Sequence, residues 1–93
     1  ERSPSEELRD LARLRLAAVL LDDKAYDEAL ALLAAKHAAP LEAQYAALRG
    51  DILVAKNRPA EAKAAYQLAL DKADARNAAF RASVQLRLDA LGG

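Results

Sequence analysis

The sequence predicts an all-α protein, an α-solenoid of two helical hairpins followed by a C-terminal capping helix, with five helices in total. Three observations predict this class. First, 25 alanines and 17 leucines account for 42 of the 93 residues, whereas glycine and proline contribute three residues each, which favours helix nearly everywhere. Second, very short breaks separate the apolar segments, so that neighbouring helices run antiparallel. Third, the sequence repeats itself at a fixed offset.

The first helix has a clear start signal. Ser3 is suited to cap the helix, Pro4 to occupy its first position, and Glu6 to complete a capping box. Apolar residues continue from there to Leu21, and the polar residues 22–24 predict the end of the helix.

Proline and asparagine mark the next two breaks. The second helix is predicted over residues 25–37, because Pro40 disfavours helix in the residue before it. The third is predicted over 41–56. Asn57 can adopt the left-handed conformation of a tight turn, and Pro59 fits the first turn of a fourth helix.

The fourth helix is predicted to reach residue 73, and the fifth to cover 76–91. Apolar residues at spacings of four, four and three form one stripe along the fifth helix, and Gly92 follows where a C-terminal cap belongs. The stripe consists of Phe80, Val84, Leu88 and Leu91. We expect this helix to shield the last hairpin.

Composition and charge exclude several classes of function. With 14 basic and 14 acidic residues the net charge is zero, so a general attraction to nucleic acid is missing. Cysteine is absent, which excludes disulfides and leaves the redox compartment open. The longest apolar run, 16–21, is far too short to insert into a membrane. Because the chain begins with Glu1 and not Met, we expect it to be a fragment of a longer protein.

The residues needed for catalysis or metal binding do not gather in the sequence. His37 is the single histidine, and we expect it near the end of the second helix, where it interacts favourably with the helix dipole. One histidine without cysteine cannot form a zinc site. The acidic pairs at 22–23 and 27–28 lie at a turn and a helix start, where carboxylates stay solvated. We therefore predict no enzyme activity, no cofactor and no metal.

An internal repeat organises the chain. The sequence superimposes on itself with an offset of 33 residues, so that small residues match small ones and large residues match large ones. Small residues let paired helices approach closely while larger ones fill the space beside them. The residues given this role are Ala17, Leu20, Ala29, Gly50, Leu53, Ala62, Tyr66 and Ala69.

On these residues the chain resembles the tetratricopeptide repeat family. The second repeat, 40–73, has the family's pattern of small and aromatic residues in Gly50, Ala62, Tyr66 and Ala69. The first repeat, 5–38, departs from the pattern with Leu33 in the aromatic place and Lys36 in the last small place, and both repeats lack the early aromatic residue. The resemblance implies a single non-catalytic domain that binds proteins, with 76–91 as its capping helix.

The segments 14–17, 26–30, 49–53 and 86–91 resemble, more narrowly, the C-terminal part of the YfgM family. That resemblance implies a domain on the periplasmic side of the bacterial inner membrane, anchored by an N-terminal helix that this chain lacks. It implies the SecYEG translocon and the chaperone PpiD as partners. We expect a translocon-associated module of the chaperone network.

The first helix is apolar on more sides than a terminal helix of a solenoid normally is. The repeat alignment turns Leu16 and Leu20 to one side of the helix, while other apolar residues spread to another side and a few charged residues are left for water. The residues on that other side are Leu8, Leu11, Ala18 and Leu21, and those expected in water are Arg9, Asp10 and Arg13. This helix is predicted to contact preceding helices, a ligand, or a second copy in a homodimer.

In tetratricopeptide proteins the first helices of successive hairpins line the ligand surface. Carried over by position, this predicts a partner-binding groove formed by Leu11, Leu14, Ala18, Leu21, Gln44, Ala47, Asp51 and Val54. The lining is mostly apolar, which favours an apolar or amphipathic segment as its ligand. Two alternatives stay open: these residues pack on helices that precede the chain, or the domain is a self-associating scaffold or assembly subunit.

Overall fold

The computed structural model describes residues 3–92. Within that range the chain forms five α-helices and one short 3-10 helix, without strands. In chain order they are α1 (Pro4–Asp22), α2 (Tyr26–Leu33), η1 (Ala39–Leu41), α3 (Glu42–Ala55), α4 (Pro59–Lys72) and α5 (Ala78–Ala90).

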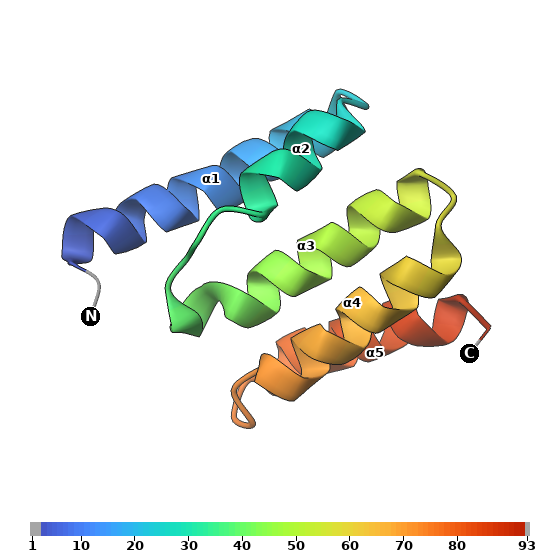
Figure 1. Ribbon diagram of the computed structural model, residues 1–93. Helices are drawn as coiled ribbons and strands as arrows, with labels where there is room; N and C mark the ends of the chain where they lie inside the picture. The colour runs from blue at the N-terminus through green and yellow to red at the C-terminus, as the bar shows by residue number, and fades with distance from the viewer. Residues whose placement is uncertain (1–2, 93) are drawn as a thin grey trace.

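The helices stack as an α-solenoid. α1 and α2 form the first hairpin, α3 and α4 the second, and α5 packs against α4 at the C-terminal end (Figure 1). α3 contacts both helices of the first hairpin. The predicted class, two hairpins plus a capping helix, is confirmed.

Local signals place the helix starts and turns. At α1, Ser3 N donates to Glu6 Oε1 at 3.0 Å and Glu6 N donates to Ser3 Oγ at 3.3 Å, which completes the capping box. Between α3 and α4 the φ angle of Asn57 is 61°, the left-handed conformation expected there. Lys24, which is 33 residues earlier, has a φ of 63° and makes the same turn in the first hairpin.

The second helix is shorter than predicted. α2 ends at Leu33 and not at 37. After it, the backbone N–H of Ala38 donates to the Asp10 carboxylate on α1 at 2.8 Å. This bond pulls the connecting segment toward α1 and takes the place of further helical turns, which the sequence pattern alone did not indicate.

α5 begins two residues later than predicted, at Ala78. Asn77 caps it, since its side chain accepts a hydrogen bond from Phe80 N at 3.3 Å. The predicted stripe faces the second hairpin, where Val84 is fully buried and Phe80, Leu88 and Leu91 pack around the core. The φ of Gly92 is 78° just after the helix, which suits a glycine at this place.

Small residues lie at the centre of each hairpin. Ala17 and Ala29 are fully buried in one core with Leu33, and Leu20 packs beside them. Ala62 and Ala69 are fully buried in the other core with Leu53 and Tyr66. Gly50 is also buried, against the ring of Tyr66. These contacts let the helices of each hairpin pack closely.

None of the described helices combines the length and the apolar character needed to span a membrane.

Candidate interaction groove

A shallow groove lies where α1, α3 and α5 meet. Its volume is about 270 Å³. α1 contributes Leu14, Arg15 and Ala18, α3 contributes Gln44, Ala47, Leu48 and Asp51, and α5 contributes Phe80 and Arg87. We call this surface the groove.

The structure brings five of the eight predicted groove residues together in this groove. They are Leu14, Ala18, Gln44, Ala47 and Asp51. The other three lie elsewhere: Leu11 lines a neighbouring pocket, Leu21 packs around the core of the first hairpin, and Val54 is exposed at the end of α3. The predicted surface is thus concentrated on the central turns of α1 and α3.

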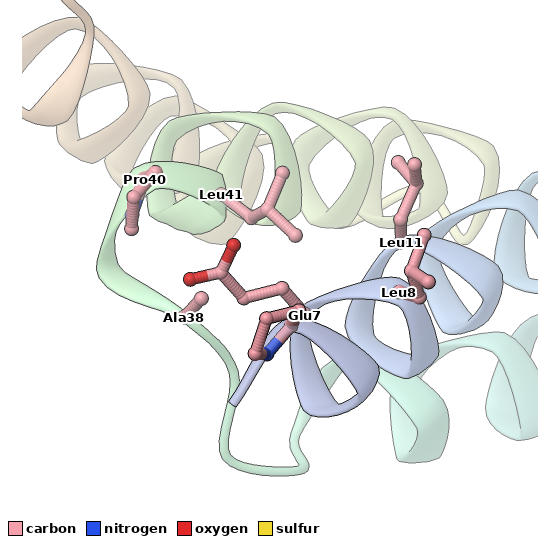
Figure 2. A pocket seen from close by; sticks show the side chains of 7 residues that line it. Glu7, Leu8, Leu11, Ala38, Pro40 and Leu41 are labelled. Carbon is pink, nitrogen blue, oxygen red and sulfur yellow. The ribbon is translucent and has the colours of Figure 1, made fainter. Parts of the chain in front are cut away.

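The neighbouring pocket lies between the start of α1 and the segment 38–41. It has a volume of about 440 Å³ and is lined mainly by apolar side chains. Figure 2 shows the Glu7 carboxylate extended between Leu41 and Ala38, with Leu8 and Leu11 further along α1. It extends the apolar surface toward the N-terminal end of α1.

α5 supplies two groove residues that the sequence analysis missed. Phe80 and Arg87 were assigned only to a capping helix, yet both line the groove. The 33-residue offset does not find them. An offset of 36 residues places Phe80 on Gln44 and Arg87 on Asp51, and that shifted repeat is the signal that identifies α5 as a third helix of the groove.

Asp51 joins three helices beneath the groove. Tyr66 Oη on α4 donates to Asp51 Oδ1 at 2.5 Å, and Arg87 Nη1 on α5 donates to Asp51 Oδ2 at 3.0 Å. Arg87 Nη2 also donates to Ser83 Oγ at 2.8 Å. The charges of Asp51 and Arg87 therefore offset each other, and this part of the groove carries little net charge.

The same contacts raise the pKa of Tyr66 well above its usual value, first because burial disfavours the phenolate and then because the phenol donates to Asp51. The unfolded chain loses this proton near pH 10.0, the usual value, while the folded chain keeps it. Folding then becomes less favourable as the pH rises above about 10, by up to about 1.4 kcal/mol per pH unit.

We expect Tyr66→Phe to flatten this alkaline loss of stability. The phenylalanine side chain has no proton to lose, so the free energy of unfolding should fall less steeply between about pH 9 and pH 11. Urea denaturation at several pH values measures both slopes. Identical slopes for the two proteins would contradict the assignment, and Tyr26→Phe, at a half-buried tyrosine outside this network, is the matched control.

Two predicted placements near the groove are wrong. Asp10 was expected in water, but it is fully buried and accepts hydrogen bonds from Ala38 N and from Arg13 Nη1, the latter at 3.1 Å.

His37 lies in the connecting segment and not in a helix. It stacks on Tyr45 with ring centroids 4.0 Å apart, and its Nε2 lies 2.6 Å from Glu42 Oε1. The connector is therefore held by contacts to α1 and α3, and His37 does not lie in the last turn of a helix as predicted.

Gln44 provides an unused hydrogen-bond acceptor. Its Oε1 atom is buried and has no partner among residues 3–92, and the side chain lines the groove. Because buried polar atoms are nearly always hydrogen-bonded, the Gln44 amide would have to turn toward the groove before this oxygen could meet a donor from a ligand.

Metal ligands do not gather anywhere in the described part of the chain: no three His, Cys, Asp or Glu residues there are placed to hold an ion. The groove offers a mainly apolar surface with one exposed arginine, Arg15. Such a surface recognises shape and apolar side chains.

Comparison with known families gave one match. A family model described as Tetratricopeptide repeat-like domain matches residues 1–93. Neither the curated proteins nor the solved structures gave a match.

Proposed function

Because the chain belongs to the tetratricopeptide repeat-like family, we propose that its groove binds an apolar or amphipathic segment of a protein partner. Domains of this family are generally non-catalytic modules that bind proteins. The single observation that carries the proposal is the meeting of α1, α3 and α5 around one mainly apolar groove.

The chemistry of the groove supports a helical or extended ligand with apolar side chains. Leu14, Ala18 and Phe80 are half-buried and offer apolar contact. Arg15 at the edge is exposed and favours an acidic residue beside the apolar ones.

We further propose a place for this module on the periplasmic side of the bacterial inner membrane, in a membrane-anchored protein associated with the SecYEG translocon. The support is the resemblance of segments 26–30 and 86–91 to the YfgM family. In that setting the partner would be a PpiD-like chaperone, the translocon itself, or an emerging apolar client segment.

Site-specific crosslinking tests both levels of the proposal. A photoreactive amino acid at Arg15, an exposed residue that lines the groove, should form adducts with SecYEG subunits or a PpiD-like chaperone when the membrane-anchored protein is expressed in bacterial cells. Leu14→Glu should reduce these adducts about tenfold or more, because a buried carboxylate costs several kcal/mol in an apolar contact. Leu86→Glu, at an exposed leucine on α5, is the matched control and should leave them unchanged.

The possible results separate the two levels. Adducts with other proteins that Leu14→Glu removes would support the groove and contradict the translocon assignment. Adducts that are insensitive to Leu14→Glu would contradict the groove itself. Adducts between two copies of the chain would favour the self-associating scaffold in place of both.

A further inference from the structure

The groove and the neighbouring pocket follow each other along one face of α1. Leu8 and Leu11 line the pocket, while Arg15 and Ala18, seven residues further along, line the groove. Residues seven apart in an α-helix point in nearly the same direction and lie about 10 Å apart along its axis. The two hollows are therefore parts of one surface.

The neighbouring helix has the same spacing. Leu41, directly before α3, lines the pocket, and Leu48 on α3 lines the groove seven residues later. On both sides the residue numbers rise from the pocket toward the groove, so α1 and α3 run parallel along the two hollows. We call the pocket and the groove together the seam.

The spacing of the two hollows favours a helix as the ligand. A ligand with one apolar anchor in each hollow has to bridge about 10 Å, which takes seven residues of an α-helix or three residues of an extended chain. Side chains seven residues apart on a helix point to the same side, whereas side chains three residues apart on an extended chain point to opposite sides. Only the helix presents both anchors to the seam.

The two ends of the seam carry opposite charges. At the pocket end, the Glu7 carboxylate extends between Leu41 and Ala38 (Figure 2). At the groove end, Arg15 is exposed. Within residues 3–92 neither Glu7 nor Arg15 has an ion-pair partner. A ligand with a basic residue at one end and an acidic residue at the other would be attracted to both.

These charges also set the direction of the ligand. A helix is stabilised by acidic side chains in its first turn and by basic side chains in its last turn. With its acidic end beside Arg15 and its basic end beside Glu7, the ligand helix runs antiparallel to α1. The opposite direction would require charges that oppose the ligand's own helix dipole.

A second copy of this chain does not supply such a helix. Among the described α-helices only α4 combines an acidic first turn with a basic last turn, through Glu61 and Lys72. α4 exposes no large apolar side chain within the described residues. The charge pattern and the two anchors therefore point to another protein.

We propose that the seam binds an amphipathic α-helix of another protein, antiparallel to α1. From its N-terminus, this helix has an acidic residue beside Arg15, an apolar anchor in the groove, a second apolar anchor seven residues later in the pocket, and a basic residue beside Glu7. This assignment rests on the proposed function, because the groove is one half of the seam.

A designed peptide tests the spacing. It is alanine-rich and about 17 residues long, with acidic residues in its first turn, leucines at its fifth and twelfth positions and lysines in its last turn. Fluorescence anisotropy of the labelled peptide measures Kd for the 93-residue protein. We expect Leu11→Gln, in the pocket and outside both cores, to raise Kd about fivefold or more. Val19→Gln, at an exposed residue of α1 that lines neither hollow, is the matched control and should leave Kd unchanged.

A second peptide tests the direction. It keeps the two leucines but has lysines in its first turn and acidic residues in its last turn. We expect the double variant with Glu7→Lys and Arg15→Glu to raise Kd for the first peptide about fivefold and to lower Kd for the second about fivefold. Both side chains are exposed, and circular dichroism checks that the fold is kept.

The results separate this inference from the proposed function. If Leu14→Glu abolished binding of the first peptide while Leu11→Gln and the charge exchange left Kd unchanged, the inference would be overturned and the groove would stand. Absence of binding at about 1 mM peptide would also overturn it, and crosslinking in cells then decides separately whether the groove binds a ligand. A dimer in sedimentation velocity that Leu11→Gln dissociates would make a second copy the occupant, against the inference.

Discussion

Gly50→Leu is expected to destabilise the domain by about 3 kcal/mol. A Cβ atom at position 50 would already lie 2.5 Å from Tyr66 Cε1, which is far inside van der Waals contact. The tyrosine ring cannot easily move away, because its hydroxyl is hydrogen-bonded to Asp51. The whole second hairpin would therefore have to open to admit the leucine.

The predicted loss of stability is informative, because replacing a glycine inside a helix normally raises stability: glycine there is unfavourable by about 1 kcal/mol relative to alanine. Without the contact to Tyr66, replacing Gly50 would stabilise α3. Chemical denaturation measures the difference, with Ala55→Leu at an exposed position on the same helix as control. A stabilised Gly50→Leu protein would contradict the close packing of α3 on α4.

Asp10→Ala is expected to cost about 3 kcal/mol, the second large effect. The carboxylate is fully buried and accepts hydrogen bonds from Ala38 N and Arg13 Nη1. Its removal leaves the buried backbone N–H of Ala38 without its acceptor and takes the charge partner from the half-buried Arg13, and an unpaired buried polar group is costly. The loss should loosen the connecting segment against α1.

The midpoint of urea denaturation measures this effect. Asp22→Ala, at an exposed aspartate on the same helix, is the matched control and should change stability by less than about 0.5 kcal/mol. If Asp10→Ala were as mild as the control, the buried carboxylate would not hold the connector to α1, and the early end of α2 would need another cause.

The difference between Asp10 and Asp22 shows what the sequence could not predict. Local patterns assigned both residues to solvent: Asp22 belongs to the polar end of α1, and Asp10 was grouped with the charged residues along the helix. Asp10 is buried because Ala38, 28 residues later, donates to it. His37 is a similar case, since its place was assigned from a predicted helix end that this long-range contact removes.

The sequence likewise predicted only part of the candidate groove. The internal repeat predicted one surface formed by Leu14 and Ala18 on α1 with Gln44 and Ala47 on α3, and the structure places these four residues around one groove. Equivalent residues of stacked hairpins point to the same side. The repeat also predicted Leu21, which packs inward, and Val54, which lies outside the groove. These two sit where small differences in helix rotation decide what a side chain faces.

The sequence by itself determined the number and order of the α-helices and the turns within the two hairpins. Caps, prolines and the left-handed Asn57 act within one or two helical turns, so their effect does not depend on the rest of the chain. Only the tertiary structure decided that α2 ends at Leu33, that α5 forms a wall of the groove, and which side of α1 is open. These features depend on contacts such as that between Asp51 and Arg87, which are 36 residues apart, and the free energy of such contacts comes from burial and pairing that no short segment contains.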